Sequence, residues 1–166
     1  SGLPLFQRGY RQSTGDAPLN EVVAAALLRM SEWDKKTTLI DPFCGSGTIL
    51  IEAALLAAGI PSNIERTHYA FKNMANFDAD LWEEIHSKAN KLVKELPCTL
   101  IGGDIDSQMV MKTRRNLRGF SFGRFIEVHN ASLEEFPFPE GPAVMITNPP
   151  YGERLETDVE DLYGTL

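Results

Sequence analysis

The stretch Thr38-Leu39-Ile40-Asp41-Pro42-Phe43-Cys44-Gly45-Ser46-Gly47-Thr48 decides the fold of this chain of 166 residues. A short apolar run ends at an acid, a glycine turn follows, and Ile49 to Ala58 is almost wholly apolar. Gly59 and then Pro61 end that run, as a glycine and a later proline commonly end helices. The stretch therefore predicts a strand, a tight turn and a helix, which together present backbone N–H groups to a ligand. A tight turn without a ligand is the alternative, because short glycine motifs occur often by chance.

Length and composition indicate one globular domain. The chain is 43% hydrophobic and 23% charged, which is ordinary for a soluble protein. Its net charge of −7 argues against binding nucleic acid by charge alone. Cys44 and Cys98 lack the spacing of metal ligands, so we expect no metal and a reducing cytoplasm. The longest apolar run, 48–60, is interrupted by Glu52 and too short for a membrane span, so we expect no membrane.

Strands and helices are predicted to alternate along the rest of the chain. We expect strands at 99–105, 125–128 and 143–147, and helices beginning at an Asp16 cap, at an Asp78 cap and at Ser107. The alternation predicts an α/β fold, namely a Rossmann-like, doubly wound, mostly parallel sheet with helices on both faces. Residues 1–16 are predicted to form an N-terminal arm, and 60–98 an insertion plus a helix. The first helix is expected to bury one apolar face, made of Leu19, Val22, Val23, Ala26, Leu27 and Met30.

Two acids follow the second predicted strand. An acid at the end of the strand after a glycine turn can hold ribose hydroxyls, and Asp104 and Asp106 are such acids. The third glycine of G-x-G-x-x-G is absent, and no Gly-Lys-Ser/Thr follows, so NAD and ATP are disfavoured. Helix capping is the alternative interpretation of Asp106.

A second pattern, Asn148-Pro149-Pro150-Tyr151, follows the last predicted strand. Prolines stiffen the strand exit, and an amide oxygen and a fixed carbonyl can accept hydrogen bonds from a planar NH₂ group. A neighbouring aromatic ring can stack on the base that carries this group. A rigid turn is the alternative, since Asn-Pro and Pro-Pro are common in turns.

Together, Asp41–Thr48, Gly103–Asp106 and Asn148–Leu155 resemble the class I S-adenosylmethionine-dependent methyltransferases that modify exocyclic amino groups. Nearly the whole chain is similar to one branch, the THUMP-associated bacterial rRNA guanine 2-amino methyltransferases. Phe6–Arg11, Ala17–Leu19 and Phe77–Trp82 belong to this resemblance. It implies a class I fold truncated at its C-terminus, with about four of seven strands present, and a THUMP RNA-binding domain that we expect to be absent from these residues.

The resemblance also implies residue roles. S-adenosylmethionine would be bound by Asp41, Pro42, Phe43, Cys44, Gly45, Ser46, Gly47, Thr48, Asp104, Ile105, Asp106, Asn130 and Ala131. Catalysis would fall to Asn148, Pro149, Pro150 and Tyr151. Many relatives carry an acid at the position of Asn130 that contacts the adenine amino group, and an amide oxygen can accept the same hydrogen bond.

The implied reaction is methylation of the 2-amino group of guanine in rRNA, by a cytoplasmic enzyme whose partner is RNA. Methylation of DNA adenine or cytosine, methylation of a protein glutamine, and a non-catalytic cofactor-binding fragment are the alternatives. Other residues carry weaker hypotheses. Glu52 is expected to bond nearby backbone or a ligand, and Cys44 to be small, buried and inert. Arg114, Arg115, Arg118 and Arg124 form either a solvated face or phosphate contacts.

Overall fold

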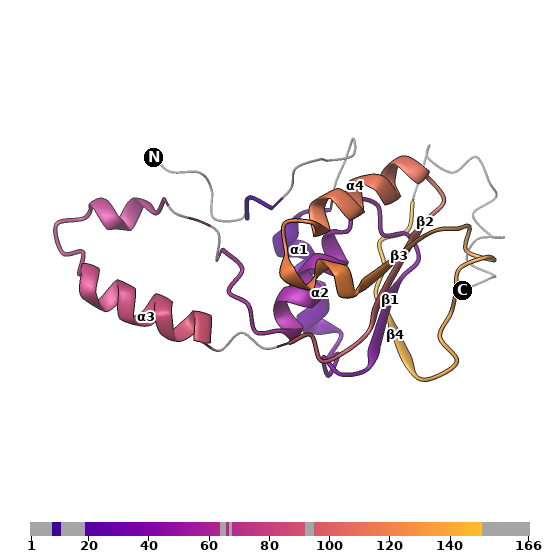
Figure 1. Ribbon diagram of the computed structural model, residues 1–166, viewed down its shortest axis with the longest axis horizontal. Coiled ribbons are helices and arrows are strands. Elements are labelled where there is room, and N and C mark those ends of the chain that lie inside the picture. The colour runs from indigo at the N-terminus through magenta and orange to yellow at the C-terminus, as the bar shows by residue number, and fades with distance from the viewer. Residues whose placement is uncertain (1–7, 11–18, 64–65, 67, 92–94, 151–166) are drawn as a thin grey trace.

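The computed structural model describes residues 8–10, 19–63, 66, 68–91 and 95–150. Four strands form one sheet in the order β3-β2-β1-β4, and every neighbouring pair is parallel. They are β1 (Thr38–Asp41), β2 (Leu100–Asp104), β3 (Ile126–Asn130) and β4 (Ala143–Met145). The predicted α/β fold with a parallel sheet is confirmed (Figure 1).

The strand order places β1 at the centre of the sheet. Leu39 lies opposite Leu100 of β2 on one side and Val144 of β4 on the other. The chain therefore moves from β1 toward β3 and then crosses back to β4. In open α/β sheets, ligands bind outside the carboxyl ends of the strands where the order reverses in this way. The Asp41–Thr48 stretch lies at that switch point.

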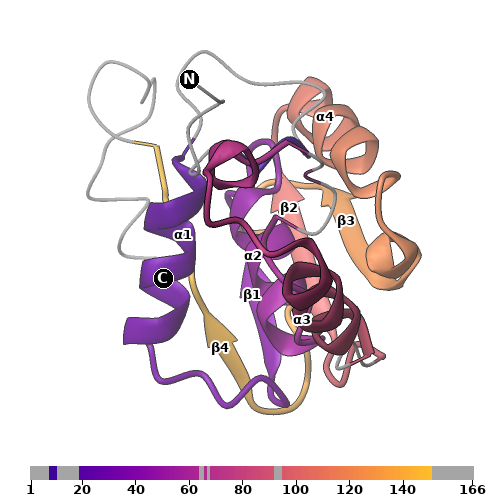
Figure 2. The same ribbon diagram turned by 90° about the vertical axis from the view of Figure 1, so that its left-hand side faces the viewer.

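Three helices pack on one face of the sheet: α1 (Glu21–Met30), α2 (Thr48–Ala57) and α4 (Ser107–Leu117) (Figures 1 and 2). Their apolar side chains form one core with Leu39, Leu100 and Ile126. Alternate strand residues point to the other face, where Ile40 and Ile101 pack with Phe136 from the β3–β4 connection. A short 3₁₀ helix, η2 (Ser121–Phe125), leads from α4 into β3.

Helix α2 is buried along most of its length. Leu50 and Ile51 have no exposed surface, as expected for a helix that is apolar all round. At its end Gly59 adopts φ 68°, and the Ile60 N–H donates to the Leu55 carbonyl at 2.9 Å. This is the glycine termination that the sequence predicts.

Helix α1 differs from its prediction in two respects. It begins at an Asn20 cap, whose side chain accepts a hydrogen bond from the Val22 N–H at 2.8 Å; the predicted cap, Asp16, lies outside the described residues. The helix buries Ala24 and Leu28, while Val22, Val23, Leu27 and Met30 of the expected face are 38% to 79% exposed. The prediction of the buried face was wrong because apolar residues occupy both sides of α1, and only the position of α2 selects one.

Residues 68–91, named here the aromatic module, project away from the sheet (Figure 1). The module contains η1 (Ala70–Asn73) and α3 (Ala79–Lys91). Asp78 caps α3 as predicted, because its Oδ1 accepts a hydrogen bond from the Leu81 N–H at 2.9 Å. The aromatic rings of the module pack against one another rather than on the main core. They belong to Tyr69, Phe71, Phe77, Trp82 and His86.

Candidate active site

Four segments that carry predicted site residues meet at the carboxyl edge of the sheet. The glycine loop (residues 42–47) follows β1, Ile105 and Asp106 follow β2, Ala131 follows β3, and Asn148 lies shortly after β4. Parallel strands bring their carboxyl ends to one edge, so the fold unites segments far apart in sequence.

The two glycines of the loop have different surroundings. Both lie in the left-handed region, Gly45 at φ 54° and Gly47 at φ 82°. A Cβ on Gly45 would meet nothing within 4 Å, whereas a Cβ on Gly47 would lie 2.7 Å from Thr113 Cγ2. Gly45 therefore keeps the backbone open to a ligand, and Gly47 is required by packing. Gly47 is also the N-cap of α2, and the first N–H groups of a helix attract electron-rich groups.

Helix α4 holds the glycine loop in place. The Thr113 hydroxyl donates to the Gly45 carbonyl at 2.6 Å, and the Asn116 amide donates to the Ser46 carbonyl at 3.0 Å. Both side chains are at most 1% exposed. Sequence reasoning missed this pair. The available signal was two polar residues, three apart, on the same side of a helix as buried Val110 and Leu117.

Asp104 connects the loop to β2. Its Oδ2 accepts the Gly45 N–H and its Oδ1 accepts the Asp106 N–H, both at 2.9 Å. Burial raises the pKa of Asp104, and these two N–H groups act in the opposite direction. Each carboxylate oxygen keeps a second lone pair, so ribose hydroxyls can still donate to it. Asp106 caps α4 through the Gln108 N–H at 2.8 Å, as the capping interpretation predicts.

Asp41 is an almost fully buried acid, 1% exposed, at the end of β1. The Thr147 hydroxyl donates to its Oδ1 at 2.7 Å. Burial raises the pKa of Asp41 to about 7 despite this hydrogen bond, and Asp104 adds to the rise. A nearby cation would favour the ionised form of this carboxyl. Thr147, another residue that sequence reasoning missed, also brings the start of Asn148-Pro149-Pro150 beside the glycine loop.

Asn130 has a defined orientation at the end of β3. Its amide nitrogen donates to the carbonyls of Asp104 and Ile105, each at 2.9 Å. The two carbonyls require the NH₂ group to face them, so Oδ1 faces away. An aspartate here could not donate these hydrogen bonds. The Ala131 N–H also donates to the Asp104 carbonyl, at 3.2 Å.

Two observations fit an adenosine-containing ligand at this edge. Ile105 is 76% exposed beside Asp104, where a flat apolar group could cover it. The open position at Gly45 leaves room for close approach of a ligand to the backbone.

Cys44 is 6% exposed, and its pKa is raised well above the ordinary value by burial and by Asp41 and Asp104. The Cys44 thiol is buried, as predicted, and its inertness stays a prediction that the raised pKa supports.

Of the predicted catalytic residues, Asn148 is exposed and Pro149 and Pro150 are half-buried. Tyr151 lies outside the described residues. The catalytic roles of all four remain predictions.

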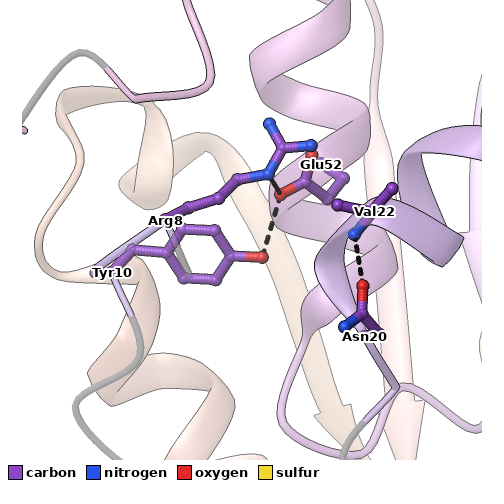
Figure 3. A network of polar contacts seen from close by, with 5 residues as sticks. All are labelled: Arg8, Tyr10, Asn20, Val22 and Glu52. Carbon is purple, nitrogen blue, oxygen red and sulfur yellow. Dashed lines mark hydrogen bonds and ion pairs between the residues drawn. The ribbon is translucent and has the colours of Figure 1, made fainter. Parts of the chain in front are cut away.

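Glu52, 3% exposed on α2, is held by side chains from residues 8–10 (Figure 3). The Tyr10 hydroxyl donates to its Oε1 at 3.0 Å, and Arg8 Nε forms an ion pair with the same oxygen at 3.2 Å.

Two of the four arginines between 114 and 124 make contacts within the fold. Arg114 donates to the Val128 carbonyl at 2.7 Å, and Arg124 lies 4.6 Å from the centre of the Phe125 ring. Among the described residues, no three His, Cys, Asp or Glu side chains gather as metal ligands, and no helix has the length and apolarity needed to cross a membrane.

The fold and this edge define a class I methyltransferase. Residues 8–166 match the RMKL-like methyltransferase domain, and the chain belongs to that family. Two curated relatives share the description ribosomal RNA large subunit methyltransferase K/L. The one from Shewanella sp. (strain MR-4) is 44% identical, over 93% of this chain and 22% of the relative. The one from Aliivibrio fischeri is 41% identical, over 95% of this chain and 23% of the relative.

Solved structures give the same family likeness. SMU.472, crystallised in complex with SAH, is 33% identical with a TM-score of 0.86, over 96% of this chain and 42% of that protein. A protein from Listeria monocytogenes, described as an N6-adenine-specific DNA methylase by prediction, is 33% identical with a TM-score of 0.82, over the same shares. This chain therefore spans less than half the length of these relatives and structures.

Proposed function

We propose that this chain is the cofactor-binding and catalytic part of an S-adenosylmethionine-dependent RNA methyltransferase, which methylates the guanine 2-amino group in large-subunit rRNA. The meeting of the glycine loop, Asp104 and the Asn148 segment at the sheet's switch point carries the proposal. The rRNA methyltransferases at 44% and 41% identity support the substrate, and the SAH-bound structure supports the cofactor.

Different residues of the chain would bind different parts of the cofactor. Asp104 would accept the ribose hydroxyls, Ile105 would cover one face of adenine, and Asn130 Oδ1 would accept from the adenine amino group. The glycine loop would pass beside the methionine part, near the carboxylate of Asp41. When bound, S-adenosylmethionine supplies an electrophilic methyl group on a sulfonium cation.

The Asn-Pro-Pro-Tyr segment would hold the target base. The base must leave its stack, at a cost of a few kcal/mol, before it can reach the site. The Asn148 amide oxygen and the Pro149 carbonyl would then accept from its NH₂ group, and Tyr151 would stack on its ring. These contacts orient the nitrogen lone pair toward the methyl group, so positioning and electrostatics supply most of the rate.

Transfer of a labelled methyl group tests the reaction. The full-length protein is given labelled S-adenosylmethionine with unmethylated large-subunit rRNA, DNA or total protein. We expect label in guanine of the RNA, and Asn148→Ala to reduce transfer at least about a hundredfold while leaving cofactor affinity unchanged. Surface Lys36→Ala is the matched control. Label in DNA adenine alone would favour the description given to the Listeria structure, and label in protein glutamine would favour the third substrate class.

Calorimetry separates the remaining alternative. Binding of S-adenosylmethionine without transfer to any of the three substrates would indicate a non-catalytic cofactor-binding protein. Folded protein that gives no binding heat would contradict both proposals.

The RNA partner requires a basic surface from elsewhere. With a net charge of −7 this chain repels phosphates overall. A THUMP domain outside these residues remains our prediction for the main RNA contact. An rRNA substrate would place the protein in the cytoplasm.

A further inference from the structure

Two adjoining cavities lie between the helical core and the aromatic module. The first, of about 370 Å³, has walls from Arg8, α1 and α2, and includes Arg29 and Glu52. The second, of about 270 Å³, is lined by Tyr69, Trp82 and His86 of the module. Pro61, Ser62 and Ala89 line both. The larger cavity falls within the range of small-ligand sites, roughly 300–1,000 Å³.

Arg8 lines the first cavity with a buried side chain that is held in place. Its side chain is 9% exposed, and its Nε is fixed by Glu52, which Tyr10 holds in turn. A carboxylate engages one edge of a guanidinium, so the opposite edge keeps N–H donors for another partner. Figure 3 shows a terminal nitrogen of Arg8 directed away from Glu52.

The charges of this cavity suit an anionic group. Arg8 and Arg29 are its cations, and Glu52, already paired with Arg8, is the one carboxylate among its described lining residues. An anion placed there would meet two guanidinium groups, the donors best matched to phosphate oxygens.

The second cavity suits a planar ring. Trp82 and His86 are stacked at 5.5 Å, and Lys72 lies 4.8 Å from the centre of the Trp82 ring. Bases stack on such aromatic walls with little sequence preference. The Asn63 side chain lines the same cavity, and its Oδ1 is buried without a hydrogen-bond partner among the described residues. A buried amide of this kind gains from a polar ligand beside it.

We propose that the two cavities form a binding site for one unpaired nucleotide of the RNA substrate, apart from the nucleotide that is methylated. Arg8 and Arg29 hold its phosphate, and the base lies against Tyr69, Trp82 and His86. The proposal rests on the proposed RNA substrate and assigns a role to the inserted module. It places a local phosphate contact on a chain whose overall charge is negative.

Arginine variants in the full-length protein test the phosphate contact. Arg8→Lys keeps a cation beside Glu52 but removes the outer guanidinium donors, and Arg29→Gln removes an exposed charge. We expect each to raise the KM for large-subunit rRNA about tenfold, with the KM for S-adenosylmethionine unchanged, and Arg29→Gln, which removes a charge, also to reduce the salt dependence of RNA binding. Lys36→Gln, which removes the same charge as Arg29→Gln from an exposed residue that lines neither cavity, should change neither.

Ring variants test the base contact. Trp82→Leu should weaken RNA binding about tenfold, and Trp82→Phe should restore most of it, because a phenyl ring still stacks. Free guanosine monophosphate and phosphate, used as competitors, distinguish a site for RNA from a site for a small metabolite.

Wild-type RNA affinity and salt dependence in both arginine variants would overturn the proposal. So would tight binding of guanosine monophosphate that does not compete with RNA. RNA binding is measured by filter retention without turnover, so these outcomes are distinct from a failure of methyl transfer.

Discussion

Helix α2 was predicted from an almost wholly apolar run and α3 from a helix pattern after the Asp78 cap, yet the two helices have opposite environments. In α2, Leu50 has no exposed surface, and the helix packs against both the sheet and α1. In α3, Leu81 and Ile85 are 51% and 55% exposed, and the helix belongs to the projecting module. A local sequence pattern therefore indicates that a helix forms, but the burial of the helix depends on what the topology places beside it.

The difference matches the roles proposed for the two regions. The glycine loop before α2 is held by hydrogen bonds from α4 and β2, which suits a cofactor of fixed shape. The module before and within α3 offers ring surfaces and cavities, which suit a polymer that must be gripped without reading a precise shape. Four measurements test this contrast.

The largest expected effect concerns the buried acid of the first region. The pKa of Asp41 is about 7 in the folded protein, against 3.8 for an unperturbed aspartate. A raised pKa means that the folded state holds an extra proton, so stability falls as pH rises from about 4 to 7. The fall amounts to at most about 4 kcal/mol, at about 1.4 kcal/mol per unit of pKa.

Urea unfolding between pH 4 and pH 8 measures this fall, and Asp41→Asn should flatten it. Asp34 is the control, because backbone N–H groups of Thr37 and Lys36 lower the pKa of this exposed carboxyl. Its replacement by Asn should leave the slope above pH 5 unchanged. If Asp41→Asn kept the wild-type slope of stability against pH, the Asp41 carboxyl would be hydrated in the folded protein and its pKa would not be raised.

The second effect compares buried and exposed leucine-like side chains. Leu50→Ala in α2 should cost about 3 kcal/mol, because it removes a buried side chain and leaves a cavity. Ile85→Ala in α3 should cost less than about 1 kcal/mol. Denaturant midpoints measure both. A large loss of stability in Ile85→Ala would mean that α3 packs against another surface when the protein is in solution.

The third effect separates the two loop glycines. Gly47→Ala should cost about 2–4 kcal/mol, because a positive φ strains alanine and the new Cβ meets Thr113. Gly45→Ala should cost only the strain, about 1–2 kcal/mol, since space is open there. The open space at Gly45 faces the proposed cofactor. We therefore expect the ratio of lost SAH affinity to lost stability to be larger for Gly45→Ala than for Gly47→Ala. Equal ratios in the two variants would contradict the assignment.

The smallest effect concerns the hydrogen bond from α4. Thr113→Val keeps the side-chain shape but removes the donor to the Gly45 carbonyl. We expect a loss of about 1 kcal/mol in stability and a roughly fivefold weaker affinity for SAH, with kcat at saturating cofactor unchanged. Thr113→Ser should restore the affinity. A change in kcat alone would place Thr113 in catalysis instead.

Much of the fold could be predicted from local chemistry. The strand at Thr38–Asp41, the helix ended by Gly59, and the Asp78 and Asp106 caps depend on a few neighbouring residues. The α1 face could not be predicted, because apolar residues occur on both of its sides. The roles of Thr113, Asn116 and Thr147 were missed for a related reason: each acts on a backbone or side-chain atom 68 to 106 residues away.

The sequence by itself determined the alternation of strands and helices, the glycine turn and the residue types of the cofactor site, because spacing, capping and glycine conformation are local properties. The family resemblance drawn from those motifs was confirmed by the match over residues 8–166. Only the tertiary structure decided that Asp41 is buried with a raised pKa, that α4 fixes the loop, and that Arg8 meets Glu52 beside a cavity. These properties depend on the dielectric surroundings and on contacts across the fold, which no local pattern contains.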